Sequence, residues 1–429
     1  MRIVLVAPCV KDPARRGAGI RLPQMGLALL AGMTPKQIDV AIMDDLPEPI
    51  DLNGNADLVG ITASTKTAVR AYEIADELRG RGVRVILGGI HATVAPHEAI
   101  EHADSVVVGE AEDVWAQVLE DCRNGRLRKL YRSGGLSTLE NAPTPRRDLF
   151  ERTNYDTVNV VQATRGCPFS CHFCSVSAIY GKGLRLRPID DVVAEINALD
   201  GDELFLADDN IVGRSDYAKQ LLRRMIPLRK QWLGQATVKV ARDPALLELL
   251  QQSGCMGLCL GFETPSIAGL REIGKRHNEV SCYAETVRKL HDKGVSIVGS
   301  FIVGLDSDDD SCFETLLEFA LRSKIDAADV HILTPYPGTV LYQRLKQQGR
   351  LLDNKWWLTY DPSEVVYLPR LMTREQLRDG WRWTRREFYK LRPTLTRCIE
   401  GSGRRSVLGN VVTWKVNMAY RKAVMREPG

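Results

Sequence analysis

The feature that most constrains this chain is a run of three cysteines crowded into eight positions. Cys167, Cys171 and Cys174 have the spacing C-x3-C-x2-C, so their thiolates can face one point from a single loop. Cysteine ligation of this kind is the usual way to hold a 4Fe–4S cluster. Because no other cysteine follows closely, one iron of such a cluster would keep an open position. A zinc site that takes His172 as its fourth ligand is the alternative.

The remaining composition is that of an ordinary globular protein. The chain has 429 residues, of which 44% are hydrophobic and 26% are charged, and this length suits about two or three domains. Ten cysteines are too few for a disulfide scaffold, so they suit a reducing compartment and metal binding. A formal net charge of +4 is too small to predict nucleic acid as a partner.

The apolar pattern predicts neither export nor a membrane span. The first apolar run, Ile3–Ala7, soon meets Lys11, Asp12 and Pro13, and it lacks the long apolar stretch and cleavage site of a signal peptide. The longest apolar stretch, Val295 to Leu305, is too short for a spanning helix. We therefore expect a cytoplasmic protein.

Residues 1–122 alternate short apolar runs with helix-like segments, which is typical of a doubly wound, Rossmann-like α/β domain with a parallel sheet. The predicted strands are Ile3–Ala7, Val40–Met43, Ala56–Thr62, Val83–Leu87 and Ser105–Val108. The predicted helices include Gln24–Gly32 and Thr67–Arg79. Residues 123–150 contain glycines and prolines without periodicity, so we expect a linker there.

The alternation resumes over 151–345, where six β/α units predict a partial (β/α)6 barrel of the TIM type. The predicted strands are Thr157–Ala163, Glu203–Ala207, Ala236–Val240, Met256–Phe262, Ser296–Val303 and Asp329–Leu333. Functional groups of such a barrel belong at the carboxyl ends of its strands. Residues 346–429 concentrate tryptophan, tyrosine and basic residues, and we expect a mostly helical region that caps the barrel or shapes a substrate site.

The three-cysteine motif at the start of such a barrel resembles the signature of the radical S-adenosylmethionine (SAM) superfamily. Phe173 before the last cysteine and Arg165-Gly166 before the motif are similar to that family too, and the resemblance spans about residues 155–345. It implies that the open iron binds the amino and carboxylate groups of SAM and that Phe173 lies near the adenine. It also implies an electron donor such as flavodoxin or ferredoxin, whose electron cleaves SAM to methionine and a 5′-deoxyadenosyl radical.

Other positions at predicted strand ends match places where that family binds SAM. Asp208 and Asp209 follow the second barrel strand, where the family holds the SAM amino group. Glu263 closes the fourth strand and is expected near the ribose or methionine moiety, and Thr334 follows the sixth, near adenine. Ordinary loop or capping chemistry is the alternative for each of them.

Placed before such a core, the N-terminal domain resembles the cobalamin-binding domain of cobalamin-dependent radical SAM proteins. The segments that carry this resemblance are Asp57-Leu-Val-Gly-Ile-Thr, Gly88-Gly-Ile-His-Ala-Thr and Val108-Gly-Glu-Ala-Glu. The resemblance implies that the cobalamin tail lies among the residues that follow these strands, namely Thr62, Ser64, Thr65, Gly88, Gly89, His91, Gly109 and Glu110. The dinucleotide fingerprint G-x-G-x-x-G is absent, since Gly17-Ala18-Gly19 lacks the third glycine.

One departure from other cobalamin proteins concerns the cobalt ligand. The motif Asp-x-His-x-x-Gly, which supplies a histidine to cobalt, is absent, and no histidine occurs before His91. We therefore expect methylcobalamin bound base-off without a histidine ligand, and we expect His91 to orient a loop. A flavodoxin-like domain without a cofactor is the alternative.

Together the two resemblances imply a C-methyltransferase that acts on an unactivated carbon of a peptide side chain, a lipid or isoprenoid, or a small natural product. The adenosyl radical would take a hydrogen atom from the substrate, which would then take a methyl group from methylcobalamin. Because cofactors carry this chemistry, no catalytic side chain is assigned. Large side chains such as Trp356, Trp357 and Tyr360 are expected to keep water out. A non-methylating cyclase or rearrangement enzyme and a cobalamin or redox sensor are the alternatives.

Overall fold

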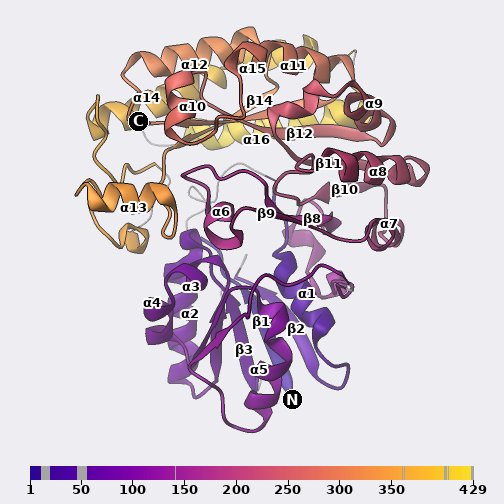
Figure 1. Ribbon diagram of the computed structural model, residues 1–429, viewed down its shortest axis with the longest axis vertical. Coiled ribbons are helices and arrows are strands. Elements are labelled where there is room, and N and C mark those ends of the chain that lie inside the picture. The colour runs from indigo at the N-terminus through magenta and orange to yellow at the C-terminus, as the bar shows by residue number, and fades with distance from the viewer. Residues whose placement is uncertain are drawn as a thin grey trace. The chain divides into compact units, whose positions relative to one another are not determined.

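The computed structural model describes residues 1–10, 20–45, 56–140, 142–359, 361, 363–400, 403 and 405–426. The described chain divides into two compact units (Figure 1). The first unit holds the residues up to Val158, except Ile20, together with 355–359. The second holds those from Asn159 to Asn354 and from Asp361 onward.

The first unit is built on a parallel sheet whose strand order is β2-β1-β3-β4-β5-β6. Its strands are β1 (Arg2–Ala7), β2 (Asp39–Asp44), β3 (Leu58–Thr62), β4 (Val85–Gly88), β5 (Ser105–Val108) and β6 (Leu130–Arg132). The order reverses direction between β1 and β3, and ligands of doubly wound sheets bind beyond the carboxyl ends of strands at such a point. The predicted Rossmann-like domain is confirmed.

Helices cover both faces of this sheet because side chains of successive strand residues point to opposite faces. Ile3 and Leu5 of β1 pack in the core with α1 (Met25–Met33) and α5 (Trp115–Arg123). Val4 and Val6 pack in the core on the other face. That face is covered by α2 (Ala68–Gly80), α3 (Ile90–Val94) and α4 (Pro96–His102).

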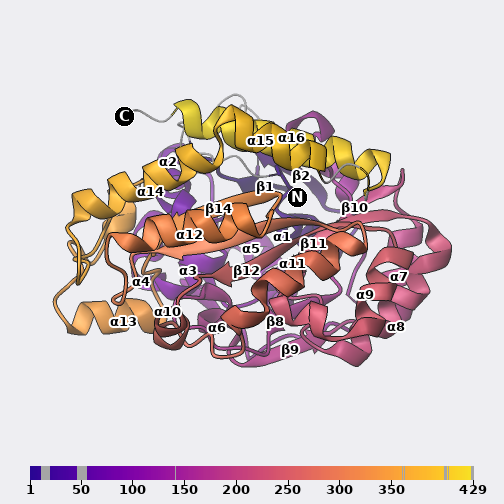
Figure 2. The ribbon, with the colours of Figure 1, turned by 90° about the horizontal axis from the view of Figure 1, so that it is seen from above.

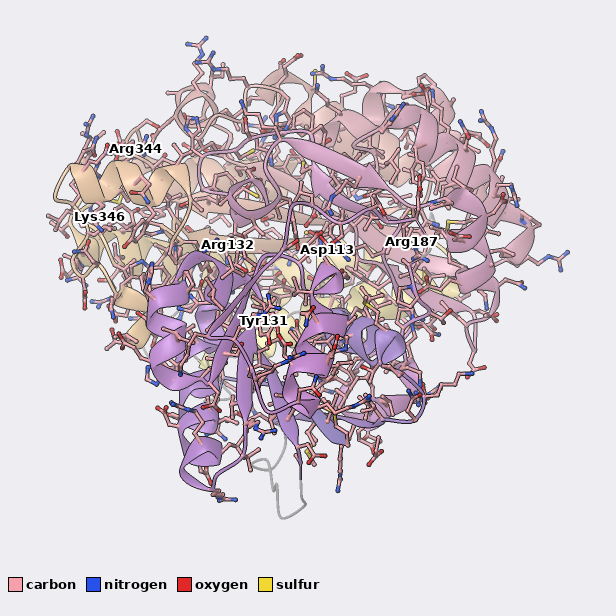
Figure 3. The ribbon with its side chains drawn as sticks, turned by 60° about the horizontal axis from the view of Figure 1, so that its bottom comes forward. Asp113, Tyr131, Arg132, Arg187, Arg344 and Lys346 are labelled. Atoms are coloured by element: carbon pink, nitrogen blue, oxygen red, sulfur yellow. The ribbon has the colours of Figure 1, made fainter. Side chains whose placement is uncertain are left out.

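The structure differs from the expected linker over 123–150, because β6 lies inside that range and joins the first sheet. Tyr131 of β6, labelled in Figure 3, is buried. Its hydroxyl donates to a carboxylate oxygen of Asp121 in α5 at 2.9 Å. A short strand with a single buried residue has no periodicity that a sequence pattern could reveal.

The second unit is built on a parallel sheet of order β14-β13-β12-β11-β10-β7, which forms the partial barrel. Its strands are β7 (Val160–Val161), β10 (Glu203–Leu206), β11 (Gln231–Ala236), β12 (Cys255–Glu263), β13 (Ser296–Val303) and β14 (Ala327–Ile332). A separate antiparallel pair is formed by β8 (Thr164–Cys167) and β9 (Gly183–Leu186).

One predicted strand is wrong. The structure has the third barrel strand at Gln231–Ala236, and the predicted range Ala236–Val240 leads into a 3-10 helix, Val238–Arg242. Val238 and Val240 are apolar because this 3-10 helix buries them in the core, and not because they belong to a strand. Periodicity over so few residues cannot separate the two conformations.

Helices follow most strands of the second unit, and its last three helices form the C-terminal region. The helices are α6 (Ser175–Tyr180), α7 (Ile189–Asn197), α8 (Ser215–Met225), α9 (Pro244–Gln252), α10 (Ile267–Glu272), α11 (Tyr283–Asp292), α12 (Ser311–Arg322), α13 (Val340–Gln347), α14 (Arg374–Phe388), α15 (Leu391–Glu400) and α16 (Val407–Arg426). None of these helices, and none of those described in the first unit, is both long and apolar enough to cross a membrane.

The C-terminal helices pack beside β14 and at the amino ends of the strands (Figure 2). Trp381 of α14 donates from Nε1 to the Val330 carbonyl at 2.7 Å. From α16, Asn417 donates to the Asp326 carbonyl, one residue before β14, at 2.9 Å. These contacts place α14 and α16 along β14 from its amino end to its middle, while Leu377 of α14 lies against Gly304, just after β13.

Candidate functional site

The three motif cysteines lie on the β8–β9 hairpin and the turn that follows β8. Cys167 is the last residue of β8, and Cys171 and Cys174 lie in the turn before α6. All three are free thiols and half-buried. Gly166 has a φ of 90°, and a Cβ there would collide with the Gly183 carbonyl, so only glycine fits where the two strands pair. The loop is thus presented from a strand pair of fixed geometry.

The surroundings of the three thiols favour a cationic centre, and their separation does not suit a single metal ion. Burial raises the pKa of Cys167, and the charge of Cys174 adds to this. Burial together with neighbouring charges raises the pKa of Cys171 to about 12. Mutually repelling thiolates need a cationic centre to hold them deprotonated. Within the described residues, no three Cys, His, Asp or Glu side chains are gathered tightly enough to hold one metal ion. Zinc would require ligands at about 2.3 Å from one point.

His172 lies between Cys171 and Cys174 and bonds to two other segments of the second unit. Its ring Nδ1 donates to the Glu272 carbonyl at 2.9 Å, and its backbone N–H donates to the Ile273 carbonyl at 2.9 Å. The Leu341 backbone N–H donates in turn to the His172 carbonyl at 2.9 Å. His172 therefore ties the cysteine loop to the segments that follow α10 and precede α13.

Asp208 and Asp209 anchor the chain that enters the cysteine loop. Asp208 is 0% exposed and accepts from the backbone N–H groups of Ala163, at 3.3 Å, and Thr164. Asp209 is half-buried and accepts from the Gly166 N–H at 2.9 Å. Burial raises the pKa of Asp208 to about 6 and also raises the pKa of Asp209. Of the two, only Asp209 has exposed surface.

Glu263 forms a buried ion pair that the sequence did not suggest. It has a φ of 65°, which is uncommon for a residue other than glycine, and Lys275 is its partner. Burial alone would lower the pKa of Lys275, but the charges of Glu263, Cys171 and Cys174 raise it. A buried cation beside a carboxylate and thiols marks a functional-site candidate. No spacing rule singles out Lys275 among the many lysines of the chain.

The ends of β13 and β14 are packed by neighbouring side chains. The Gly304 carbonyl accepts from the Tyr367 hydroxyl, and a Cβ at Gly304 would collide with that hydroxyl. Thr334, which is half-buried, donates to the Ile332 carbonyl at 3.0 Å. Tyr367, which lies between α13 and α14, therefore reaches the end of β13.

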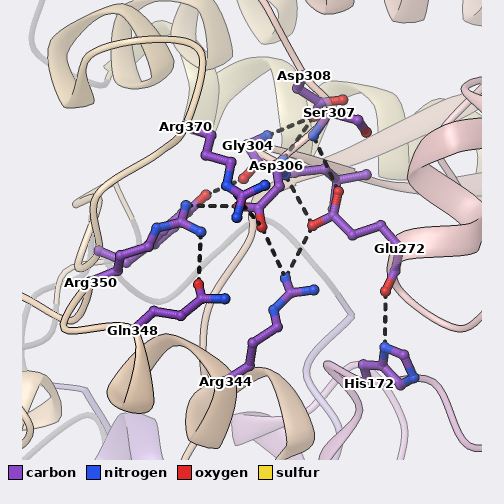
Figure 4. Close-up of polar contacts among 12 residues, drawn as sticks. His172, Glu272, Gly304, Asp306, Ser307, Asp308, Arg344, Gln348, Arg350 and Arg370 are labelled. Carbon is purple, nitrogen blue, oxygen red and sulfur yellow. Dashed lines mark hydrogen bonds and ion pairs between the residues drawn. The ribbon is translucent and has the colours of Figure 1, made fainter.

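A cluster of opposite charges lies beside these strand ends (Figure 4). Asp306 pairs with Arg350 at 2.7 Å, and Glu272 pairs with Arg344 at 3.1 Å. Glu272 also accepts from the Asp306 backbone N–H at 3.0 Å. Burial alone would raise the pKa of Asp306, but Arg350 and the charges of Arg344 and Arg370 lower it. The cluster joins α10, the loop after β13 and the segment after α13.

A cavity of about 500 Å³ opens beside the cysteine loop within the second unit. Phe169 of the loop lines it, together with Thr237 and Lys239 of the segment after β11. The Lys239 Nζ lies 5.2 Å from the centroid of the Phe169 ring, which stacks on His277 at 3.6 Å. The cavity is within the size range of small-molecule sites.

The strand-end loops of the first unit are tied together by short contacts. Gly89 has a φ of 91°, and a Cβ there would meet Thr62 and Ala63 at 2.7 and 2.9 Å. The Ala63 N–H donates to the Gly88 carbonyl at 2.8 Å. The Gly109 N–H donates to the Thr93 hydroxyl at 3.1 Å, and Thr93 donates to the Gly89 carbonyl at 2.9 Å.

The other polar residues of these loops are placed differently. Ser64 is exposed and shares hydrogen bonds with Thr67, whereas Thr65 is buried. Glu110 is buried and accepts from the Ser137 N–H at 2.7 Å. A glycine cradle with an exposed hydroxyl beside it fits the tail of a bulky cofactor. Gly17, Ala18 and Gly19 lie outside the described residues.

His91 is 0% exposed, and both of its ring nitrogens have partners. Nδ1 lies 3.2 Å from the Thr65 hydroxyl, and Nε2 lies 3.3 Å from Glu98. Burial alone would raise the pKa of Glu98, but hydrogen bonds from His91, Trp357, Lys355 and Tyr72 lower it to about 2. A histidine so occupied orients its loop and has no nitrogen to spare for a metal.

The paired cysteines elsewhere do not form a second site. Cys255 and Cys259 both lie on β12, where four residues along a strand span about 13 Å. Burial raises the pKa of both thiols, that of Cys259 to about 12. Cys255 is an ordinary buried thiol of the core, and Cys259 is half-buried.

Two family profiles cover different parts of the chain. The profile of the radical SAM superfamily matches residues 161–320, and that of the B12 binding domain matches residues 16–119. The radical SAM methyltransferase TsrM from Kitasatospora setae, solved with cobalamin and a [4Fe-4S] cluster, has the same fold: its TM-score is 0.66 at 16% identity, over 81% of this chain and 78% of that chain. The cobalamin-dependent SAM radical enzyme OxsB has a TM-score of 0.65 at 13% identity, over 96% of this chain and 72% of that chain.

Curated relatives extend the similarity over most of the chain. Bacteriochlorophyllide d C-12(1)-methyltransferase from Chlorobaculum tepidum is 30% identical over 402 residues, 90% of this chain and 87% of that protein. Bacteriochlorophyllide d C-8(2)-methyltransferase from the same organism is 30% identical over 366 residues, 80% of each. A 4Fe–4S cluster, SAM and cobalamin are therefore confirmed as the cofactors. The chain belongs to the radical SAM C-methyltransferases that carry a cobalamin-binding domain.

Proposed function

We propose that this methyltransferase acts on an unactivated carbon of an apolar, polycyclic small molecule. The observation that carries the proposal is the similarity, over 90% of the chain, to an enzyme named for methylation of bacteriochlorophyllide d. Hopanoid C-2 methylase from Rhodopseudomonas palustris, 26% identical over 78% of this chain and 66% of that protein, is named for another large apolar ring system. Of peptides, lipids and small natural products, the last two classes are thus favoured.

The second unit's residues support this chemistry by holding the loop of the radical site. When bound, the cluster and SAM supply a radical that removes a hydrogen atom from the substrate, and cobalamin supplies the methyl group. Cys167, Cys171 and Cys174 are the proposed cluster ligands. Asp208 keeps the entering strand in place through its backbone contacts. Three further residues, together with Asp209, are proposed to bind SAM: Phe173, Glu263 and Thr334.

The first unit's strand-end loops are the proposed site of the cobalamin tail. Its exposed or half-exposed members are Thr62, Ser64, Gly88, Gly89 and Gly109. The buried Thr65, His91 and Glu110 support those loops from beneath. We propose that cobalamin binds base-off with no histidine on cobalt, because both His91 nitrogens are occupied. Paramagnetic resonance of the Co(II) state should then show no splitting from a histidine nitrogen.

The cavity beside the cysteine loop supports an apolar substrate with an anionic group. Val240 and Leu246 give it apolar walls, and Lys239 adds a cation. The reaction also needs a low-potential donor such as flavodoxin or ferredoxin. We place both proteins in the cytoplasm, because buried Cys122 and Cys255 are free thiols and so suit a reducing compartment.

The test is an anaerobic incubation of the reconstituted protein with a reductant, SAM whose methyl group carries deuterium, and three acceptors. The acceptors are a chlorophyllide, a hopanoid precursor and a tryptophan-containing peptide. Mass spectrometry should detect a labelled methyl group on carbon of one of the two polycyclic compounds. Labelling of the peptide alone would overturn the proposed substrate class.

A cyclase is the second candidate because one relative favours it. Anaerobic magnesium-protoporphyrin IX monomethyl ester cyclase from Cereibacter sphaeroides is 27% identical over 459 residues, 95% of this chain and 74% of that protein. The same incubation separates the two reactions. Formation of 5′-deoxyadenosine with a ring-closed, unlabelled product would favour the cyclase, whereas no SAM cleavage at all would favour a sensor.

A further inference from the structure

Part of the C-terminal region belongs to the first unit. Residues 355–359, which we call the strap, include a 3-10 helix, Trp356–Thr359, that packs against α2. In the sequence the strap is flanked on both sides by residues of the second unit. Trp356 and Trp357 are 2% and 5% exposed, so the strap has two buried indole rings, whereas Lys355 and Leu358 stay exposed. Tyr360 lies outside the described residues.

The strap supplies two of the partners of the buried Glu98 carboxylate. Trp357 donates from Nε1 to Glu98 at 2.9 Å, and the Lys355 Nζ lies 3.1 Å from the other carboxylate oxygen. Tyr72 of α2 donates its hydroxyl to Glu98 at 3.0 Å. A buried charge that loses one of its partners is strongly destabilised. The position of Glu98 therefore depends on the strap.

Glu98 in turn fixes His91, which sits inside the strand-end loops. With Nε2–H donating to Glu98, Nδ1 accepts from the Thr65 hydroxyl. The His91 backbone N–H donates to the Ala63 carbonyl at 2.9 Å, so His91 joins the loop after β3 to the loop after β4. The Trp357 ring also meets the His91 ring edge-on, with centroids 5.4 Å apart at 69°. His91 is therefore held from four directions.

We infer that Trp357 and Lys355 are positioning residues for cobalamin: through Glu98 and His91 they set the loops at 62–65 and 88–93. This rests on the proposed placement of the cobalamin tail among those loops. The cobalamin site is then complete only when the chain has crossed the whole barrel and returned to the first unit. A cut between the two family domains would not release an intact cobalamin-binding part.

The test compares two corrinoids on the full-length chain. Cobalamin carries the nucleotide tail, whereas cobinamide lacks it, so the ratio of their dissociation constants reports the tail site alone. Trp357→Phe keeps an aromatic ring and removes the N–H that reaches Glu98. It should weaken cobalamin binding by about tenfold and leave cobinamide within about twofold, as measured by absorbance titration.

Trp381→Phe is the matched control. Trp381 is also 5% exposed and donates one hydrogen bond from Nε1, to the Val330 carbonyl at 2.7 Å, but it belongs to the second unit. The same chemical change there should leave the binding of both corrinoids within about twofold. A general loss of folding stability would move cobalamin and cobinamide together in either variant.

Lys355 allows a second pair of variants, which should disturb folding less because its side chain is 51% exposed. Lys355→Met should weaken cobalamin about threefold, and Lys355→Arg should restore it. If the unaltered protein bound cobalamin and cobinamide equally well, both the placement of the tail in the strand-end loops and the strap's role would be wrong. A tail preference that Trp357→Phe and Lys355→Met leave unchanged would overturn the strap's role alone.

Discussion

The loop that carries the three cysteines is anchored by charges, whereas the strand-end loops of the first unit are joined by glycines, threonines and a histidine. Asp208 and Asp209 hold the backbone that enters the cysteine loop, and the Glu263–Lys275 pair lies beside it. In the first unit, Glu98 lies one side chain removed from the loops at 62–65 and 88–93, because it contacts them through His91. The difference fits what each loop is proposed to hold. The thiolates of the cysteine loop need fixed charges around them, whereas the cobalamin tail in the first unit needs space and close approach of the backbone.

The largest expected effect comes from removing the thiols. Changing Cys167, Cys171 and Cys174 to Ala should reduce bound iron from about four atoms per chain to the background and abolish 5′-deoxyadenosine formation. Cobalamin binding should stay within about twofold, because the first unit keeps its loops. Iron analysis and product chromatography measure the two effects. Survival of SAM cleavage would mean that the cluster lies elsewhere.

Removing one partner of the buried Glu263–Lys275 ion pair should have the next largest effect, which is a loss of folding stability. Lys275→Met leaves Glu263 buried without its cation and should lower the free energy of unfolding by about 3–5 kcal/mol. The double variant with Glu263→Gln should recover most of that loss, because no buried charge is left. Denaturant unfolding of the four proteins gives the coupling between the two side chains. Additive losses would show that the pair does not interact.

The buried carboxylates of Glu98 and Asp208 should change the free energy of unfolding with pH in opposite directions. The pKa of Glu98 is lowered to about 2, so its stabilising contribution is present above pH 4.5 and is lost as the pH falls toward 2. The pKa of Asp208 is raised to about 6, so its contribution is present below pH 3.8 and is lost as the pH rises through 6. Each is of the order of 3 kcal/mol, since one pKa unit is about 1.4 kcal/mol.

Glu98→Gln and Asp208→Asn separate these contributions. The free energy of unfolding of the apoprotein, measured between about pH 2 and pH 7, should lose its decline below pH 4.5 in the first variant and its decline toward pH 6 in the second. If both variants and the unaltered protein showed the same dependence of unfolding free energy on pH, the opposite contributions of Glu98 and Asp208 would be contradicted.

Much of this architecture could be predicted from local patterns, and the rest depends on contacts between distant residues. The strands Ser105–Val108 and Ser296–Val303 match their predicted ranges because each is a short β-branched run with clear ends. The three cysteines were recognisable because their ligand spacing is local. Trp357 and Glu98 are 259 residues apart, and no pattern within either segment points to the other.

The aromatic residues of the C-terminal region show the same limit. Trp356 and Trp357 were expected to keep water from the site, and in the structure both are buried, with Trp357 in contact with Glu98 and His91. Lys275 was missed because a buried lysine looks like any other in sequence. Composition reveals that a large side chain needs burial, but only the fold decides which surface buries it.

The smallest expected effect concerns the partly exposed charge cluster of the second unit. Arg344→Gln removes a partner of Glu272 and should lower the free energy of unfolding by about 1 kcal/mol. Arg322→Gln, which removes an exposed pair with Glu318 on α12, should change it by less than about 0.5 kcal/mol. Equal effects of the two, in matched denaturant curves, would show that the cluster adds nothing beyond ordinary surface pairing.

The most direct test of the two-site account is the ratio of the SAM-derived products formed with each methylated molecule. In this account, one SAM would yield 5′-deoxyadenosine at the cysteine loop, and a second would supply the methyl group to the cobalamin held by the first unit, leaving S-adenosylhomocysteine. The account predicts 5′-deoxyadenosine, S-adenosylhomocysteine and methylated product in equal amounts under anaerobic turnover. Methylated product with S-adenosylhomocysteine but without 5′-deoxyadenosine would contradict it, because methylation would then proceed without the radical site.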